Sequence, residues 1–257
     1  LEGANIKLGD VVANVAGVSG RQMLEALVAG EEEPAVLAQL ARGRLRDKLP
    51  QLERALTGRV GAHQRFVLAR QLAHLDFLDA SIATVSAEIG ERLRPFAAEQ
   101  AQLETIPGVG PRTAETLLAE VGADLGRFPT AKQFASWAGM CPGNDESAGK
   151  RRSGKTRKGR PGLRAALVEA ARAASRSKGT YLAAQYRRVA ARRGGKRAAV
   201  AVGHSILVSV YYILTGGEPY RELGGDYFDQ RDRPAVAQRS VRRLEGLGYK
   251  VTLESAA

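Results

Sequence analysis

The sequence from Leu103 to Ala114 is Leu-Glu-Thr-Ile-Pro-Gly-Val-Gly-Pro-Arg-Thr-Ala. A helix is expected to end before Pro107, because proline lacks the amide that a continuing turn needs. A new helix is expected to start at Pro111 and run to Val121. Gly108-Val109-Gly110 between them fits a tight hairpin, so the pattern is that of a helix-hairpin-helix. Its glycines let the backbone approach a nucleic-acid phosphate, and the free amides of the hairpin receive it. The alternative is a plain connection between two helices.

Upstream of the hairpin, apolar residues follow a heptad-like spacing that ends before Pro95 and predicts one long helix. They are Leu68, Leu72, Leu75, Leu78, Ile82, Val85, Ile89 and Leu93. Two interpretations stay open: a helix that packs on its own domain, or an antiparallel or intersubunit coiled coil over residues 62–100. Residues 1–61 contain short amphipathic pieces punctuated by glycine, and we expect a helical linker there.

Downstream of the hairpin, the pattern is again helical, so the predicted fold class is mainly α with a compact helical domain over 101–225. Thr130 is a plausible N-cap for the helix that follows it. Further helices are expected over 163–175, 181–192 and 197–214, and near 235–247 in a charged tail from 226 to 257. The apolar run Ala198–Leu214 is interrupted by Gly203, His204, Ser205 and Ser209, which favours a buried core helix over a membrane span.

The charge of the chain is concentrated in one window. The net charge is +12, and residues 147–197 hold 17 Lys and Arg with one acid, Glu169. Such clustering points to a polyanionic partner, most often nucleic acid, although a charge run is also typical of a solvated face or a disordered tail. Aromatic residues make up 5%, so a stacking platform is not expected as the main binding device. The expected phosphate contacts are Gly108, Val109, Gly110, Arg112, Lys150, Arg151, Arg152, Lys155, Thr156, Arg157, Lys158 and Arg160.

Two other site classes are excluded. The single cysteine and the three histidines rule out a disulfide framework and a Cys/His zinc module. Gly149–Thr156 fits the pattern of a nucleotide-binding P-loop, but turn formers precede it and no helix can begin directly after it. The segment Arg151–Lys158, with Ser153-Gly154 midway, instead suggests a short basic β-ribbon.

Ser147 lies among small residues and directly precedes the dense cationic run. Surrounding Lys and Arg side chains can lower the pKa of a serine hydroxyl and stabilise a pentacovalent phosphorane during attack on a phosphodiester. A serine in a loop is ordinarily a turn residue, and the residues alone leave both interpretations open.

Two longer segments resemble the C-terminal transposase domain of the insertion sequence 110 family, also called the 116/902 type. They are Thr105–Ala114 and Phe134–Gly159, the latter with the block Ser147-Ala-Gly-Lys. Tyr220–Phe228 resembles the end of the family's sequences, and Ala4–Leu8 and Gly17–Arg21 resemble its linker. The resemblance implies a bacterial, nucleoid-associated DNA transposase in which Ser147 attacks the DNA backbone. It also implies a guide RNA that pairs with donor and target DNA, and a dimer or tetramer held by residues 62–100.

The family also implies an N-terminal RuvC-like domain with four acidic residues that bind Mg²⁺. Residues 1–61 show no alternating apolar strands with spaced acids, so we expect the second half of a transposase, without a cofactor of its own and inactive alone. Three interpretations compete. The chain is this part of a transposase, a non-catalytic nucleic-acid-binding module, or an oligomerisation module built on the apolar seam, the heptad-like row from Leu68 to Leu93.

Overall fold

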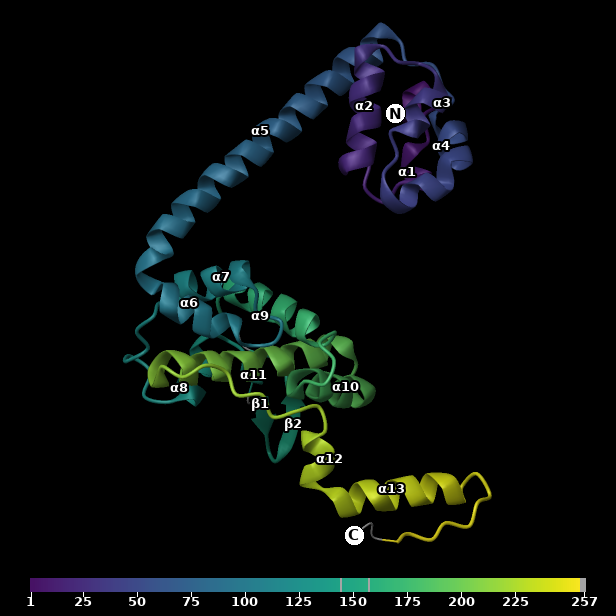
Figure 1. Cartoon of the computed structure of the whole chain (residues 1–257). Helices are drawn as coiled ribbons and strands as arrows, with labels where there is room; N and C mark the ends of the chain where they lie inside the picture. Colours follow the sequence, from purple (N-terminus) through teal and green to yellow (C-terminus); the bar gives the residue numbers. More distant parts are fainter. Residues whose placement is uncertain (144, 157, 255–257) are drawn as a thin grey trace. The chain divides into compact units, whose positions relative to one another are not determined.

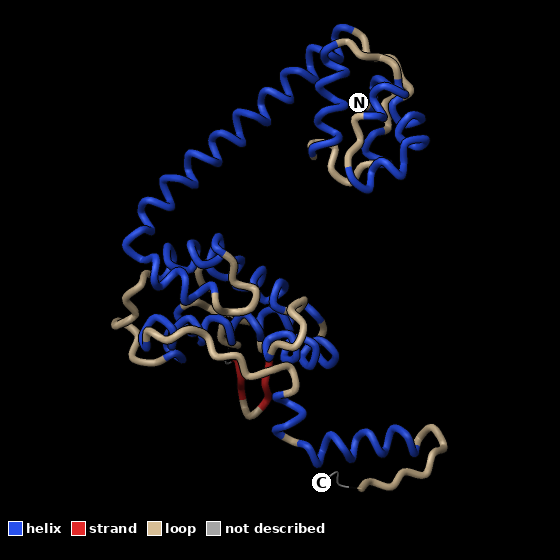
Figure 2. The backbone as a smooth tube through the Cα atoms, in the orientation of Figure 1, coloured by secondary structure: helices blue, strands red, loops and turns tan. Residues whose placement is uncertain are grey.

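The computed structural model describes every residue except 144, 157 and 255–257, and it describes only the backbone at 145, 146, 151 and 152. The described residues are mostly helical, and their paired strands form one two-stranded sheet (Figure 1, Figure 2). The predicted mainly α fold class is therefore confirmed. The chain divides into two compact units, Leu1–Glu88 and Ile89–Ala257, and each has its own hydrophobic core.

The first unit is a small helical body. Its elements are η1 (Glu2–Ala4), α1 (Leu8–Val11), α2 (Val18–Ala29), α3 (Pro34–Gln39), η2 (Gly43–Lys48), α4 (Leu49–Leu56) and most of α5 (Ala62–Leu93). Leu8, Met23, Leu37 and Leu52 are fully buried in it. Helix α3 packs on α2 and α4, and α4 also packs on α1. Residues 1–61, which were expected as a helical linker, fold around a core that they share with Leu68 and Leu72 of α5.

Helix α5 covers the predicted seam, and its two parts differ in packing. Leu68 and Leu72 are buried in the core of the first unit. Further along, the side chains of Ile82 and Val85 are 61% and 59% exposed. The first part of the seam therefore packs on its own unit, and the middle part presents apolar side chains to solvent. Leu93, at the end, packs against the core of the second unit. The division between the two units falls between Glu88 and Ile89, inside the segment 62–100 for which the sequence leaves a coiled coil open.

The second unit is built around one central helix, α11. The elements are η3 (Arg94–Phe96), α6 (Ala97–Glu104), α7 (Pro111–Val121), α8 (Ala131–Trp137), β1 (Asp145–Ser147), β2 (Lys150–Ser153), α9 (Pro161–Ala174), α10 (Tyr181–Arg193), α11 (Gly195–Gly216), α12 (Tyr227–Arg231) and α13 (Arg233–Glu245). Helices α6, α8, α9 and α10 all pack on α11 (Figure 1). Val202, Ile206 and Val210 recur every four residues and are fully buried, so one face of α11 forms the centre of the core.

Helix α11 is, among the described residues, the one helix long and apolar enough to cross a membrane by length and composition. Half of its most apolar window is buried inside the protein. A side-chain Cβ at Gly203 would lie 3.0 Å from Cε of Met140 and 3.2 Å from the carbonyl oxygen of Leu167. The glycine therefore lets α9 and Met140 approach α11 closely, as befits the core helix that the sequence predicted.

Several helix ends follow the sequence signals. Helix α7 begins at Pro111 and ends at Val121, as predicted. The hydroxyl of Thr130 accepts a hydrogen bond from the amide of Gln133 at 3.3 Å, which confirms Thr130 as the N-cap of α8. At the other end of the unit, α12 and α13 contain no buried residue, so the tail adds nothing to the core.

Candidate nucleic-acid interface

Ser147 lies at the tip of an antiparallel ribbon. Strand β1 pairs with β2 so that Ser147 stands opposite Lys150. Ala148 and Gly149 between them have φ angles of 52° and 71°, the positive pair that a type I′ hairpin turn requires. Ser147 and Lys150 are both exposed. The ribbon therefore presents a hydroxyl and an ammonium group side by side.

A basic ribbon is present, as predicted, but the predicted position of its turn was wrong. The sequence suggested a turn at Ser153-Gly154, whereas the structure turns at Ala148-Gly149 and ends β2 at Ser153. Alanine is a poor residue for positive φ, so Ala148 carries no local signal for the observed turn. The side chains of Arg151 and Arg152, and all of Arg157, lie outside the described residues, and their expected phosphate contacts stay predictions.

The two feet of the ribbon, by which we mean Pro142-Gly143 and Lys155-Thr156, pair with each other. Pro142 bridges to Thr156, and the amide of Gly143 donates to the carbonyl of Lys155 at 2.7 Å. Arg164 of α9 donates through Nη2 to the Thr156 hydroxyl and to the carbonyl of Gly139, the latter at 3.2 Å. Thr156, expected as a phosphate contact, therefore anchors the ribbon to α9. Arg164 was missed from the sequence because its partners lie in another segment of the chain.

Trp137, the single tryptophan of the chain, lies beneath two arginines. The guanidinium groups of Arg127 and Arg160 lie 5.0 Å and 5.2 Å from the centre of its ring. Arg160 also pairs with Glu120, with Nη1 3.1 Å from Oε2. The side chain of Arg160 is still 55% exposed. This expected phosphate contact therefore also holds the start of α9 to α7 and α8.

The turn between α6 and α7 is built into the core. At Gly108, φ is +88°, and a Cβ there would lie 2.3 Å from the carbonyl oxygen of Ala170 and 2.5 Å from the amide of Ala174. Val109 is buried, and its amide donates to the carbonyl of Ile106 at 2.9 Å. That amide is engaged within the turn, and the expected phosphate contact of Val109 stays a prediction.

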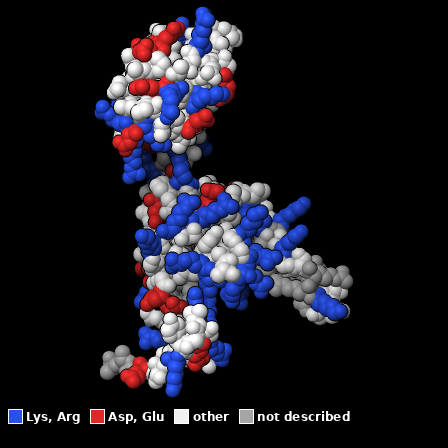
Figure 3. Space-filling model, turned by 90° about the vertical axis from the view of Figure 1, so that its right-hand side faces the viewer, with Lys and Arg blue, Asp and Glu red and all other residues white. Residues whose placement is uncertain are grey.

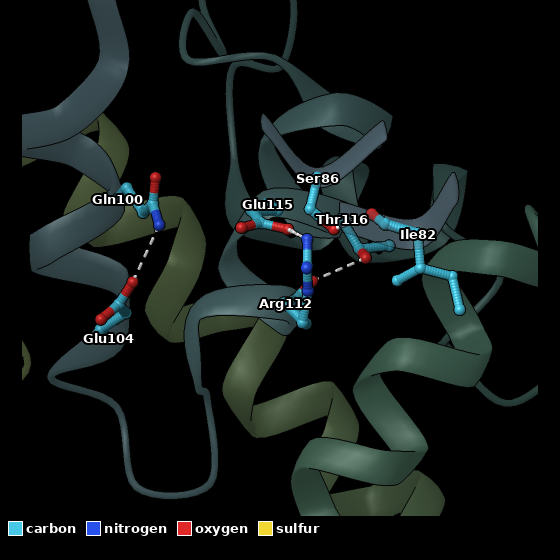
Figure 4. A network of polar contacts seen from close by, with 7 residues as sticks. All are labelled: Ile82, Ser86, Gln100, Glu104, Arg112, Glu115 and Thr116. Atoms are coloured by element: carbon cyan, nitrogen blue, oxygen red, sulfur yellow. Dashed lines mark hydrogen bonds and ion pairs between the residues drawn. The ribbon is translucent and has the colours of Figure 1, made fainter. Parts of the chain in front are cut away.

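Gly110 and Arg112, by contrast, are exposed at the start of α7. Nη1 of Arg112 donates to Oε2 of Glu115 at 2.8 Å, and the Thr116 hydroxyl donates to the carbonyl of Arg112 at 2.8 Å (Figure 4). The side chain of Arg112 is 63% exposed. The bond to Glu115 orients the guanidinium group, which stays largely exposed at the surface.

Helices α7 and α9 run antiparallel, and this separates the predicted contacts. Gly108, ahead of α7, approaches Ala170 and Ala174 near the end of α9. Glu120, near the end of α7, binds Arg160 just before α9 begins. A helix of 14 residues is about 21 Å long. The hairpin contacts and the ribbon contacts therefore lie near opposite ends of α9, not in one cluster.

The basic window, residues 147–197, contributes exposed Lys and Arg side chains to the surface of the second unit. Lys155 and Lys158 are exposed, as are Arg187 and Arg192 on α10. Within 147–197, Arg160 and Arg172 are the basic side chains that pair with an acid, as far as the structure describes them. Lys and Arg side chains gather across the middle of the face drawn in Figure 3, with few acidic ones among them. This surface suits a polyanion.

A magnesium site does not fit the described residues. No group of three or more His, Cys, Asp or Glu among them could hold a metal ion. No step proposed below therefore passes through a metal.

Comparison with known proteins gives one consistent result. Residues 100–187 match the family described as Transposase IS116/IS110/IS902 family. A "Probable family 20 transposase" of Pseudomonas aeruginosa is 35% identical over 111 residues, which are 42% of this chain and 32% of the relative. A "Putative transposase y4pF/y4sB" of Sinorhizobium fredii is 33% identical over 129 residues, 48% of this chain and 33% of the relative.

A third relative is the "Insertion element IS110 uncharacterized 43.6 kDa protein" of Streptomyces coelicolor, 34% identical over 125 residues and matched over 31% of its length. The chain thus spans about a third of the length of the curated relatives it matches. The matched segment contains the α6–α7 turn, the ribbon and the start of α10. Residues 100–187 of this chain are therefore similar to the IS116/IS110/IS902 transposase family.

Proposed function

We propose that this chain is the part of a DNA transposase that binds DNA and supplies the nucleophile, Ser147. The family supports the transposase activity in general. One observation supports the serine in particular. Ser147 is exposed at the tip of a ribbon whose feet are anchored, and it stands directly opposite Lys150.

The proposed chemistry is a pair of phosphoryl transfers. Oγ of Ser147 attacks a backbone phosphorus and forms a serine–phosphate ester, while the bond from phosphorus to one deoxyribose oxygen breaks. The serine proton passes to solvent, and the leaving oxygen takes up a proton to become a hydroxyl. A deoxyribose hydroxyl of another strand then attacks the same phosphorus and releases the serine. Lys150 stabilises the charge that develops on the phosphate oxygens.

The basic side chains around the ribbon and the hairpin hold the DNA in place. Lys155, Lys158 and Arg160 lie near the ribbon, and Gly110 and Arg112 lie at the start of α7. Contacts of these kinds to phosphates position a protein on nucleic acid without reading its sequence. We propose that a guide RNA, as the family resemblance implies, supplies the sequence information by base pairing.

We also propose that the chain assembles with further copies through residues 62–100. The exposed Ile82 and Val85 of α5 support this, because large apolar side chains on one helix face are stabilised when a second helix covers them. Assembly brings two serines to one DNA junction, as the joining of two broken strands requires.

The test is a covalent adduct between protein and DNA. The complete transposase is incubated with end-labelled element DNA and its guide RNA, and the products are separated under denaturing conditions. We expect a labelled protein band that Ser147→Ala abolishes while DNA binding is retained. Ser153→Ala, which alters another serine of the same ribbon, should keep the band. A band that persists in Ser147→Ala would exclude this serine as the nucleophile.

A further inference from the structure

A groove of about 500 Å³ lies between α10, α11 and the segment 218–223. That volume is in the range of small-molecule sites. Tyr181, Tyr212 and Tyr220 all line the groove, so three of the seven tyrosines of the chain meet in one place. The chain is poor in aromatic residues, and the fold nevertheless concentrates them here.

The walls of the groove are held in place by hydrogen bonds. The amide of Tyr220 donates to Oγ1 of Thr105 at 2.9 Å. The amide of Tyr181 donates to Oε1 of Glu222 at 2.7 Å. The segment that closes the groove is therefore attached both to the end of α6 and to the start of α10. A site fixed in this way loses little entropy when a ligand binds.

Polar groups are placed among the apolar walls. Burial lowers the pKa of His204, which keeps its imidazole neutral at physiological pH. The hydroxyl of Ser209 donates to the carbonyl of Ser205 at 3.1 Å, so its oxygen remains able to accept a hydrogen bond. Ser205 also lines the groove, and its Oγ accepts a hydrogen bond from Nε2 of Gln185 at 2.8 Å.

We propose that this groove binds one unstacked nucleobase of a nucleic-acid strand that runs over the second unit. A base is flat and uncharged, with π faces for Tyr212 and Tyr220 and with polar edges for His204 and Ser209. The ring of Tyr181 already stacks on Phe228, with 5.1 Å between the ring centres, and forms the side of the groove. Arg221 lines the groove and is exposed, where it can meet the adjoining phosphate. The proposal rests on the nucleic-acid binding proposed above and adds a defined pocket to it.

The rest of the lining agrees with this ligand. Leu182, Val208, Ile213 and Pro219 give an apolar surface along the groove, which suits the faces of a base. Glu218 is the acid of the lining and Arg221 its arginine, so the lining as a whole does not favour a strongly charged small molecule. The basic surface of the second unit would bring a strand to this groove.

Photocrosslinking tests the position of the base. Single-stranded DNA and RNA oligonucleotides that carry iodouracil are bound to the full chain, irradiated, and the crosslinked peptides are identified by mass spectrometry. We expect crosslinks to peptides that contain Tyr181, Tyr212 or Tyr220. The DNA and RNA arms show which strand supplies the base.

Binding of the same oligonucleotides tests the energetics. Tyr212 is 63% exposed, so Tyr212→Ala should leave the core intact and weaken affinity by about fivefold or more, as the loss of one base–aromatic stack does. Tyr249→Ala is the matched control, because Tyr249 is 65% exposed and lies outside the groove. Ser209→Leu, which fills the groove without removing a ring, should weaken affinity similarly.

The outcomes separate the two proposals. An oligonucleotide that fails to bind the chain at low salt contradicts nucleic-acid binding itself and the pocket with it. Salt-dependent binding with no crosslinks to the three tyrosines, and with Tyr212→Ala equal to Tyr249→Ala, overturns the pocket alone. Crosslinks in the groove together with the losses in Tyr212→Ala and Ser209→Leu support it.

Discussion

Positive φ angles serve different purposes at Ala148 and at Gly108. Ala148, at 52°, turns the chain directly after Ser147. A non-glycine residue in this conformation costs roughly 1–2 kcal/mol, and such strain persists where the surrounding structure holds it, often at functional sites. The tied feet of the ribbon, at Gly143 and Thr156, supply that support. Gly108, at 88°, is different because its conformation serves the core.

Gly108→Ala should destabilise the second unit strongly. The left-handed conformation costs about 1–2 kcal/mol for alanine, and the overlap of its Cβ with Ala170 and Ala174 adds about 1–3 kcal/mol. Gly217→Ala is the matched control, because Gly217 has φ +71° with no atom within 4 Å of its Cβ position and so reports conformational strain alone. Urea denaturation measures both variants, and equal losses of stability would contradict the close approach of α9.

His204 should make stability depend on pH. In the folded state, burial lowers the pKa of His204 below the ordinary value of 6.5. The unfolded chain therefore binds a proton at this histidine more readily. The free energy of unfolding should therefore fall as pH drops below about 6.5, until the folded pKa is reached. His204→Gln, which cannot take up a proton, should flatten this part of the curve. Denaturation at a series of pH values measures how the free energy of unfolding changes with pH. If His204→Gln shows the same pH dependence as the parent protein, other groups cause it.

Among the elements, helices were easier to predict than the pairing between segments. Pro111 and the hairpin glycines mark the start of α7 in the sequence itself, and the spacing from Leu68 to Leu93 marks α5. The register of the ribbon was not readable, because Ala148 carries no local preference for positive φ. The core of residues 1–61 was not readable either, because short amphipathic helices do not reveal which of them pack together.

The exposed seam of α5 should mediate assembly. Ile82→Glu places a charge in the proposed interface, which costs several kcal/mol unless the charge is paired, so the assembly should dissociate. Light scattering coupled to size-exclusion chromatography should then give a molar mass near the 27.5 kDa of one chain. Ala80→Glu, at an exposed position off the seam, should leave the mass unchanged. An Ile82→Glu variant with the mass of the parent protein would exclude this helix face as the interface.

At the scale of the whole molecule, the net positive charge comes from residues 147–197 of the second unit, because the rest of the chain carries more acids than Lys and Arg. The identity of the candidate contacts could be taken from that window, because clustered Lys and Arg within 147–197 are visible in the sequence. The arrangement of these contacts in space could not be predicted from the sequence. Arg160 reaches Trp137 and Glu120, and Arg164 reaches Thr156, through contacts between segments that only the folded chain brings together.

The salt dependence of DNA binding tests this charge distribution, and Trp137 provides the signal. Because it is the single tryptophan and Arg160 stacks on it, its fluorescence should change when Arg160 meets a phosphate. With about five phosphate contacts on duplex DNA, log affinity should fall against log salt with a slope of about −4.5. Lys150→Ala should make that slope less steep by about 1, while Lys48→Ala, an exposed lysine of the first unit, should not change it. A slope near zero in the parent protein would mean that the basic window does not bind the DNA backbone, and assembly through α5 would then be the function that remains.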